Sequence, residues 1–244
     1  MRTKRQTGET LASHALEQLL SMICNYEFPE RKLPAEAELA QQLGISRTVL
    51  RDVLSSIETL GFITRKRGVG TIINEHIIAA KPRLDIDLIV EKAIAEAGYE
   101  SEMIHVDLQI IPATTQVAER LSIPVGTRIV RVERLFSAQG QPAVYIVQCF
   151  LESLLNGPYL FEEFHRSVLE FFAKRCDIQI DTNLSIVKPL LAEDTLAAKM
   201  RITPGTLLLY LDEIDYDQHK QPVLWTEEYF VSDLIEFKMM RQKI

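Results

Sequence analysis

Cysteine is scarce in this sequence, with three residues in 244, and the three stand far apart. An odd number of isolated cysteines does not make a disulfide framework, so a small secreted scaffold held by disulfides is excluded. Cys24, Cys149 and Cys176 are expected to be reduced thiols, which is typical of a cytoplasmic protein.

Long apolar runs are also missing. No stretch approaches the roughly 18 consecutive apolar residues that a membrane-spanning helix needs. Residues 1–5, MRTKR, are basic, but the apolar segment of a secretion signal does not follow them. We therefore expect a cytoplasmic protein with no membrane partner.

The spacings of a metal centre or a catalytic triad are absent as well. His105, His165 and His219 fall in separate predicted elements, without the interval that metal ligands require. No Ser-His-Asp or Cys-His arrangement can be argued from the sequence. These absences predict a protein that is not an enzyme and that uses no metal and no cofactor.

The length and the charge distribution indicate two domains with different tasks. A chain of 244 residues with 47% hydrophobic content exceeds one typical domain and can bury real cores. Residues 1–80 carry 10 Lys and Arg against 9 Asp and Glu, whereas residues 81–244 carry 17 against 25. Because the acidic second part would repel nucleic acid, any DNA affinity must come from cations clustered in the first part.

Residues 32–71 carry the pattern of two helices joined by a tight turn. Gly44 tolerates a positive φ and breaks a short apolar helix. Ser46 follows as a good N-cap for a second helix, and Thr48 offers a weaker hydroxyl. The apolar residues of that second helix recur at intervals of three and four, at Val49, Val53, Ile57 and Leu60. This is the pattern of a helix-turn-helix.

Positive charge falls where a recognition helix would meet DNA. Arg47 and Arg51 are four residues apart, so they share the face opposite the apolar stripe, near the N-terminal end of the second helix. A guanidinium group there could grip guanine O6 and N7 in the major groove. The alternative is a solvated basic face on a small helical module.

A basic hairpin follows this helix. Gly61 ends the helix, and the apolar runs 62–64 and 71–73 flank the turn Arg65-Lys66-Arg67-Gly68-Val69-Gly70. A cationic hairpin beside a recognition helix is a wing that can reach a DNA backbone or minor groove.

These residues resemble the winged-helix domain of GntR-family bacterial transcription regulators. The resemblance covers roughly residues 10–75 and is carried by Leu33-Pro34-Ala35-Glu36, Glu38-Leu39-Ala40, Gly44-Ile45-Ser46-Arg47, Arg51, Leu60-Gly61-Phe62-Ile63 and Gly68-Val69-Gly70-Thr71. It implies double-stranded DNA as a partner. The DNA-binding residues expected from the charge pattern and the resemblance together are Glu36, Ser46, Arg47, Thr48, Arg51, Arg65, Lys66, Arg67, Gly68 and Gly70.

The sequence departs from the family at three positions of this domain. Ala35, Ala37 and Val49 stand where the family usually has Ser, Arg and Thr. The Arg at the Ala37 position is a DNA contact in the family, so its absence implies an operator that differs from the usual consensus.

The domains expected from these patterns are residues 1–75, a linker at 76–84, and residues 85–244. The last part contains an internal duplication, because residues 117–127 echo residues 196–206. After a helix at 85–97, each copy reads as a short helix, a Pro/Gly turn and two strands joined by a polar turn, with strands at 129–136, 143–151, 207–216 and 223–231. The fold class is therefore α+β: a winged helix-turn-helix domain and an antiparallel sheet with helices on one side.

The second domain resembles the UTRA effector-binding domain of HutC-like GntR regulators, which is similar in fold to chorismate lyase. The phrases PVGTRIVRVERLFSAQGQP and TPGTLLLYLDEIDYDQHKQP carry this resemblance. It implies that the domain binds a small-molecule effector and forms a homodimer. A dimer is also expected on physical grounds, because two symmetric copies read a palindrome.

The resemblance also implies positions for the effector. Of the groups that bind phosphosugars in some family members, Arg134 and Ser167 are retained, whereas Phe136, Leu224 and Phe230 replace an Arg, a Glu and a Tyr. The expected pocket is therefore more apolar and less suited to a phosphosugar.

Two further candidates come from the duplication itself. Gln148 and Glu228 recur at equivalent offsets in the return strands, and strand alternation places them on the face opposite Tyr145 and Trp225. We expect Gln148 and Glu228 to line the effector pocket; alternatively, they face solvent or a dimer partner.

The function expected from the sequence is a DNA-binding transcriptional regulator, a repressor whose operator affinity a small effector modulates. Two alternatives remain. The second domain could only dimerise, or, given its resemblance to chorismate lyase, it could be an enzyme.

Overall fold

The computed structural model describes residues 3–28, 30–86, 89–157, 163–164 and 171–241. The chain divides into two compact units, one made of Met1–Arg83 with Lys238–Ile244 and the other of Leu84–Phe237. The chain therefore passes between the units twice. Within the described ranges, no helix is both long enough and apolar enough to cross a membrane.

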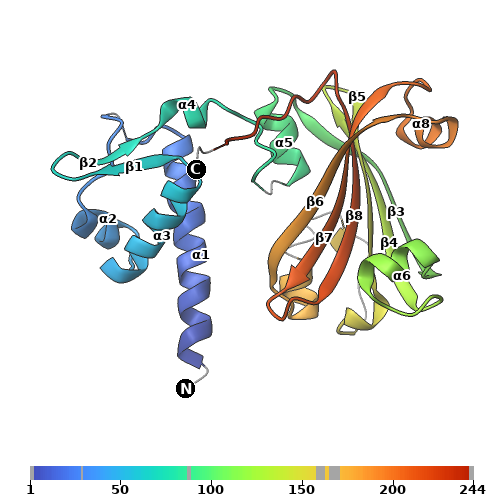
Figure 1. Cartoon of the computed structure of the whole chain (residues 1–244), viewed down its shortest axis with the longest axis horizontal. Helices are drawn as coiled ribbons and strands as arrows, with labels where there is room; N and C mark the ends of the chain where they lie inside the picture. Colours follow the sequence, from blue (N-terminus) through green and yellow to red (C-terminus); the bar gives the residue numbers. More distant parts are fainter. Residues whose placement is uncertain (1–2, 29, 87–88, 158–162, 165–170, 242–244) are drawn as a thin grey trace. The chain divides into compact units, whose positions relative to one another are not determined.

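The first unit has the predicted helix-turn-helix and hairpin (Figure 1). Its elements are α1 (Thr3–Cys24), α2 (Glu36–Gln42), α3 (Arg47–Thr59), β1 (Ile63–Lys66), β2 (Gly70–Ile73) and α4 (Glu75–Ile78). Strands β1 and β2 pair antiparallel. Helix α1 begins seven residues before the expected Thr10 and packs along α3.

The apolar stripe of α3 forms the core of this unit. Leu50, Val53, Leu54 and Ile57 are buried. Helix α3 packs against α1 and β1, which contribute the buried residues Ala15, Leu19, Ile23 and Ile63. Because the buried residues of α3 recur at helical spacing, its opposite face stays in solvent.

Residues 75–83, most of which the sequence suggested as a linker, fold against the first unit. Ile77 and Ile78 of α4 are buried. The Arg83 guanidinium donates to the Leu60 carbonyl at 2.9 Å, just after α3, and lies 5.1 Å from the centre of the Phe62 ring. The Lys238 N–H donates to the Pro82 carbonyl at 2.8 Å, so the C-terminal segment is held in the same unit.

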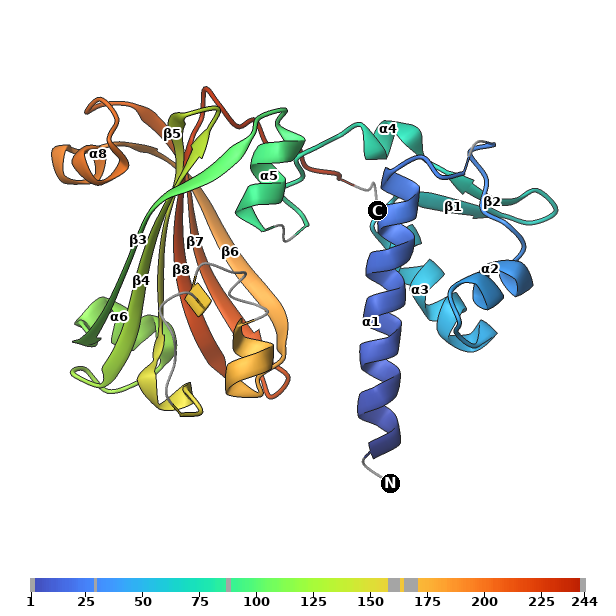
Figure 2. The ribbon, with the colours of Figure 1, turned by 180° about the vertical axis from the view of Figure 1, so that it is seen from behind.

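The second unit is built on one six-stranded antiparallel sheet, in the order β3-β4-β5-β8-β7-β6 (Figure 2). Its strands are β3 (Ser101–Pro112), β4 (Arg128–Ala138), β5 (Gln141–Leu151), β6 (Ile180–Leu191), β7 (Leu207–Asp217) and β8 (Pro222–Val231). Its helices are α5 (Val90–Glu96), α6 (Thr115–Leu121) and α8 (Asp194–Met200), with short helical segments η1 (Glu152–Leu154) and η3 (Phe172–Cys176). The α+β fold class is confirmed.

Two strands were missing from the sequence-based expectation. β3 and β6 precede α6 and α8, so each copy of the duplication is strand, helix, strand, strand, and the extra strands form the two edges of the sheet. Helix α5 is shorter than the expected 85–97, because it starts after Ile89.

The two faces of the sheet are covered differently. On one face, called the helix face below, α6 and α8 pack on residues such as Ile129, Tyr145 and Trp225. On the opposite face, called the α5 face below, α5 packs on Phe136 and Phe230. The same face also carries η3, so helical elements lie on both sides of the sheet and not on one only.

Candidate DNA-binding surface and effector site

The N-terminal end of α3 is shaped by its cap. The Ser46 hydroxyl accepts the Val49 N–H at 3.2 Å, and Gly44 before it has a φ of 66°. This turn leaves Arg47, Thr48 and Arg51 exposed on the first turns of the helix. The two guanidinium groups expected to meet DNA are therefore in solvent and not in the core.

The two arginines are not equivalent. Arg51 Nε donates to the Glu36 carboxylate of α2 at 2.8 Å, so Glu36 positions Arg51. Arg47 has no hydrogen-bond or ion-pair partner among the residues that the structure describes. Glu36, which the sequence placed among the DNA-binding residues, thus orients an arginine, and Arg47 is available for a base edge.

Arg65 anchors the hairpin to the recognition helix. Its Nε and its backbone N–H each donate to the Glu58 carboxylate, at 2.7 and 2.8 Å, and its Nη2 donates to the Ser55 hydroxyl at 3.2 Å. These donors hold the pKa of Glu58 below its usual range, the backbone N–H of Arg65 contributing most. Lys66 and Arg67 remain exposed at the turn, where Gly68 has a φ of 77°.

A further lysine, which the sequence analysis missed, lies against the hairpin. Lys32 forms a bridge with Ile72, and its Cε lies 2.6 Å from where a Cβ on Gly70 would stand. Gly70 has a φ of 109°, so its backbone conformation favours glycine there, whereas the end of the flexible Lys32 side chain could move aside for a Cβ. Lys32 thus adds a cation beside Gly70 of the hairpin; a lysine before Leu-Pro was the only signal in the sequence.

Lys66→Ala should reduce the slope of log K against log salt concentration by about one for each wing that contacts DNA, with little change in base preference. Arg65→Ala should act differently, because it also releases the hairpin from Glu58. We expect Arg65→Ala to lower the melting temperature, and Lys66→Ala to leave it unchanged. Fluorescence anisotropy at several salt concentrations, with thermal melts, separates the two; equal melts would contradict the anchoring role.

The candidate effector residues Arg134, Gln148 and Glu228 share the α5 face; strand alternation had predicted a common face for Gln148 and Glu228. Arg134 donates to the Gln148 Oε1, and Gln148 Nε2 donates to the Thr226 hydroxyl at 3.3 Å. Arg134, Gln148 and Thr226 are all buried. Gln148 therefore faces the interior, and Thr226 is a neighbour that the sequence analysis missed.

The charge of Arg134 is influenced by two acidic residues from different elements. Burial lowers the pKa of Arg134, and the carboxylates of Glu91 and Glu228 act in the opposite direction. Glu91 belongs to α5 and Glu228 to β8. The positive charge of the buried guanidinium is thus partly compensated by one carboxylate from the helix and one from the sheet.

The space beside Arg134 is small and aromatic. A cavity of about 10 Å³, room for about one water molecule, is lined by Val132, Arg134, Gln148, Phe150, Glu163, Phe164 and Phe171. The Phe150 ring centre lies 5.9 Å from that of Phe171 and 6.3 Å from that of Phe164. An effector larger than a water needs these aromatic side chains to move.

The other expected effector positions are divided: Leu224 packs among side chains that line this cavity, Phe136 and Phe230 lie in a different cluster, and Ser167 lies outside the described residues. Leu224 is buried in the cluster around Phe150. Phe136 and Phe230 pack under α5, where the Phe230 ring centre lies 4.8 Å from that of Phe237.

A wider hollow of about 540 Å³ lies beside η1, lined by Thr127, Arg128, Glu152, Ser153, Leu155 and Gly157. Arg128 is already paired there with Glu152 at 2.5 Å, and its side chain is exposed. Among its described lining residues, the hollow has no buried polar side chain comparable with Arg134, so the smaller cavity is the better candidate.

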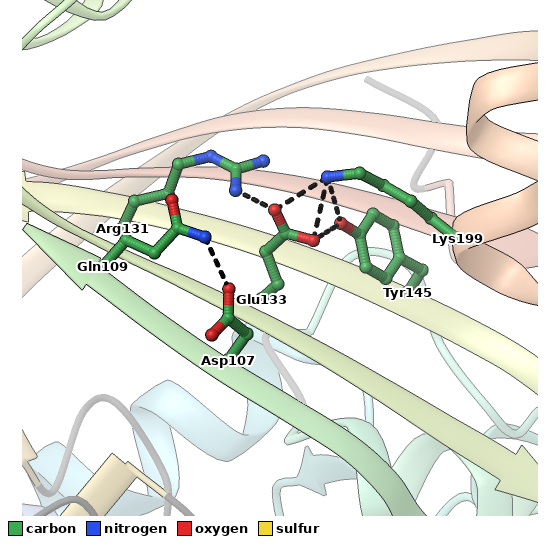
Figure 3. Close-up of polar contacts among 6 residues, drawn as sticks. All are labelled: Asp107, Gln109, Arg131, Glu133, Tyr145 and Lys199. Carbon is green, nitrogen blue, oxygen red and sulfur yellow. Dashed lines mark hydrogen bonds and ion pairs between the residues drawn. The ribbon is translucent and has the colours of Figure 1, made fainter. Parts of the chain in front are cut away.

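A polar network occupies the helix face instead. Lys199 of α8 contacts the Glu133 carboxylate of β4 at 2.8 and 3.0 Å, and Arg131 and the Tyr145 hydroxyl also donate to Glu133 (Figure 3). Asp107 and Gln109 of β3 lie beside this group (Figure 3). Burial raises the pKa of Tyr145 to about 12, so its hydroxyl stays a donor at neutral pH.

The duplication produces a second, equivalent network in which the two copies exchange roles. Arg120 of α6, in the first copy, pairs with Asp212 of β7, in the second copy, and the Trp225 Nε1–H donates to Asp212 at 2.9 Å. Lys199 in the second copy pairs with Glu133 in the first. The helix of each copy therefore carries a cation that pairs with a carboxylate on a strand of the other copy. These ion pairs connect the two halves of the sheet.

Comparison with known families agrees with both units. Residues 11–73 match bacterial regulatory proteins of the gntR family, and residues 96–236 match the UTRA domain. The HTH-type transcriptional repressor NagR of Bacillus subtilis (strain 168) is 25% identical over 224 residues, which is 90% of this chain and 89% of NagR. The HTH-type transcriptional regulator GgaR of Escherichia coli (strain K12) is 22% identical over 208 residues, which is 84% of this chain and 80% of GgaR.

Solved structures show the same fold. YydK from Bacillus subtilis subsp. subtilis str. 168 has a TM-score of 0.68 at 19% identity, covering 95% of this chain and 99% of that one. PhnF from Mycobacterium smegmatis has a TM-score of 0.58 at 20% identity, covering 87% and 92%.

Proposed function

Since this chain belongs to the GntR family of bacterial regulatory proteins, a family of transcription regulators and not of enzymes, and carries a UTRA domain, we propose that it is a repressor controlled by a small-molecule effector. The observation that carries the DNA-binding part is the exposure of Arg47 and Arg51 at the N-terminal end of α3, beside the basic hairpin.

A homodimer provides two such helices. Each α3 enters one major groove of a half-site, and the two half-sites are separated by about one turn of the DNA. The wing cations Lys66, Arg67 and Lys32 contact phosphates and add affinity without reading sequence.

The effector acts at Arg134 in this proposal. Glu91 lies on α5, the first helix after the chain leaves the DNA-binding unit, and its carboxylate favours the charged form of Arg134. An effector with an acidic group competes with Glu91 for the guanidinium and releases α5. Residues 232–237, which lead back to the first unit, include Ile235 and Phe237 in the same cluster as α5. Both chain connections therefore start at the cluster under α5, the helix that carries Glu91, which makes α5 a suitable point of control.

Repression, and not activation, is proposed because of the similarity to NagR, which is a transcriptional repressor. A second domain that serves only for dimerisation is the competing proposal, and the small volume of the cavity beside Arg134 favours it.

An effector screen tests the proposal. Phosphosugars, amino-acid derivatives and more apolar acids are added to the purified chain, and the melting temperature and operator affinity are measured. An effector at 100 times its Kd should stabilise the chain by about 2.7 kcal/mol and change operator affinity. Arg134→Met should abolish both responses, whereas Arg128→Met, outside the cavity, should keep them. Melting shifts without a change in DNA affinity would overturn the regulatory role, and no shift with any compound class would support dimerisation alone.

A further inference from the structure

Arg83 is a buried charge in the first unit. Its side chain is 3% exposed, and among the described residues of that unit no other charged side chain is buried. A guanidinium group is rarely taken out of water, because the burial of a charge is costly unless other groups compensate it. The first unit therefore places Arg83 inside for a reason that its contacts should reveal.

The Arg83 side chain holds the joint between α3 and the hairpin. Its Nη1 donates at 2.9 Å to the carbonyl of Leu60, the C-cap of α3, and its guanidinium lies 5.1 Å from the centre of the Phe62 ring. The helix dipole favours a cation at the C-terminal end of a helix, and the ring quadrupole favours a cation over an aromatic face. One side chain therefore binds both sides of Gly61, the residue between Leu60 and Phe62.

The joint needs such contacts because Gly61 is its middle residue. Gly61 has a φ of 83°, and a glycine has the least intrinsic rigidity of any residue. Asn74, which follows the hairpin, holds two carbonyls there: its Nδ2 donates to the Gly61 carbonyl at 2.7 Å, and its backbone N–H donates to the Phe62 carbonyl at 2.8 Å. The three consecutive carbonyls of residues 60–62 are thus each bound by a later residue, and Arg83 binds the one that ends α3.

The backbone around Arg83 is held in turn by the C-terminal segment. The Lys238 N–H donates to the Pro82 carbonyl and the Lys238 Nζ donates to the Lys81 carbonyl, both at 2.8 Å. Arg83 and Lys238 also form a parallel bridge. Lys238 lies 157 residues after Lys81 and belongs to the first unit. The first unit is therefore completed by a segment from the other end of the chain.

We propose that Arg83 is a positioning residue for DNA recognition, and that the C-terminal segment holds it in place through Lys238. This inference rests on the proposed DNA-binding function and deepens it. Helix α3 lies in the major groove while the wing contacts the adjacent backbone, so both bind one duplex only if the angle at Gly61 is fixed. Arg83 sets that angle without touching DNA, because its side chain is buried.

Arg83→Met tests the positioning role in the full-length chain. The probes are an operator that the wild-type chain selects from a random DNA library and a scrambled sequence of the same length. Well below the melting temperature, the affinity for the operator should fall about 10-fold, comparable with the loss of one good base contact, and the affinity for the scrambled sequence should not change. The slope of log K against log salt concentration should also not change, because Arg83 neutralises no phosphate. Fluorescence anisotropy measures all three quantities.

Arg83→Lys is the conservative variant. It keeps a cation that can donate to the Leu60 carbonyl but loses the planar group over Phe62, so its operator affinity should lie between those of the wild type and Arg83→Met. A lower melting temperature of Arg83→Met with an unchanged ratio of operator to scrambled affinity would show a structural role only. That result would overturn this inference and leave the proposed function standing. A wild-type chain that selects no DNA sequence would overturn the proposed function itself.

Two substitutions at Lys238 test the C-terminal segment. Lys238→Pro removes the N–H that the Pro82 carbonyl accepts, whereas Lys238→Ala keeps that N–H and loses only the side-chain contact with the Lys81 carbonyl. Lys238→Pro should lower the ratio of operator to scrambled affinity as Arg83→Met does, and Lys238→Ala should keep it near the wild-type value. Equal ratios for the two Lys238 variants would overturn the role of the C-terminal segment.

The double variant Arg83→Met with Lys238→Pro shows whether Lys238 acts through Arg83. Because both substitutions disturb the same contact, the double variant should lose no more operator affinity than Arg83→Met alone. Losses that simply add would show that Lys238 acts independently, which contradicts the proposal. Circular dichroism reports whether each variant is folded, and if Arg83→Met is not, the ratios of Arg83→Lys and Lys238→Pro to the wild type decide the question.

Discussion

Arg47→Ala should lower operator affinity by roughly 1–3 kcal/mol for each half-site and relax the base preference at the position that Arg47 reads. Arg47 is the first residue of α3, it is exposed, and no polar partner holds it within the described part of the chain. A bidentate contact from such a side chain to guanine is the commonest specific contact in the major groove. The measurement is fluorescence anisotropy at fixed salt, with the operator and with its single-base variants.

The control for this substitution is Arg128→Ala in the second unit, which removes the same charge from an exposed side chain far along the sequence. It should change operator affinity by much less than Arg47→Ala. If Arg47→Ala bound the operator as tightly as the wild type, with unchanged base preference, α3 would not be the reading helix.

Arg120→Ala should lower the free energy of unfolding of the second unit by about 2–3 kcal/mol. The substitution leaves Asp212, 4% exposed, with the Trp225 N–H but without its cation. Removal of one partner from a fully buried pair costs about 3–5 kcal/mol, and the cost is smaller here because the Arg120 side chain is 33% exposed.

Lys199→Ala is the matched comparison, since Lys199 is the equivalent cation in the second copy. It should cost less, about 1 kcal/mol, because Lys199 is 42% exposed and Glu133 keeps both Arg131 and the Tyr145 hydroxyl. Urea denaturation of both variants, followed by the Trp225 fluorescence, gives the two values. A larger loss for Lys199→Ala would show that Arg120 and Lys199 have different roles from those assigned.

The winged-helix unit could be predicted from the sequence because its signals are local. Gly44, Ser46 and the apolar stripe of α3 lie within a few residues of one another, and each acts through its own turn of backbone. The same reasoning placed Arg47 and Arg51 in solvent, since residues four apart share a helix face.

The edge strands could not be predicted in the same way. β3 has polar residues and β6 apolar residues on the same face, so neither the alternation nor the duplication identified them as equivalents. Their strand conformation depends on pairing, of β3 with β4 and of β6 with β7, and the local sequence pattern does not reveal that pairing.

In the candidate effector site, alternation alone placed Gln148 and Glu228 on the face opposite Tyr145 and Trp225. Alternation could not identify the groups that act on this pair. Thr226, which accepts from Gln148, lies 78 residues further along the chain, and Glu91, whose charge acts on Arg134, comes from a helix before the sheet. Contacts between such distant segments depend on strand order and register.

The sequence by itself determined α3 with its cap and charges, the two-copy architecture and the side of the sheet on which Gln148 and Glu228 lie, because those depend on the geometry of short stretches of chain. The tertiary structure alone decided that Arg65 holds the wing to Glu58, that Arg120 and Lys199 reach into each other's repeat, and that β6 is left as an apolar open edge. Each of these features depends on contacts, or on the lack of a pairing strand, between segments that are distant in sequence, and only the folded tertiary structure sets which segments become neighbours.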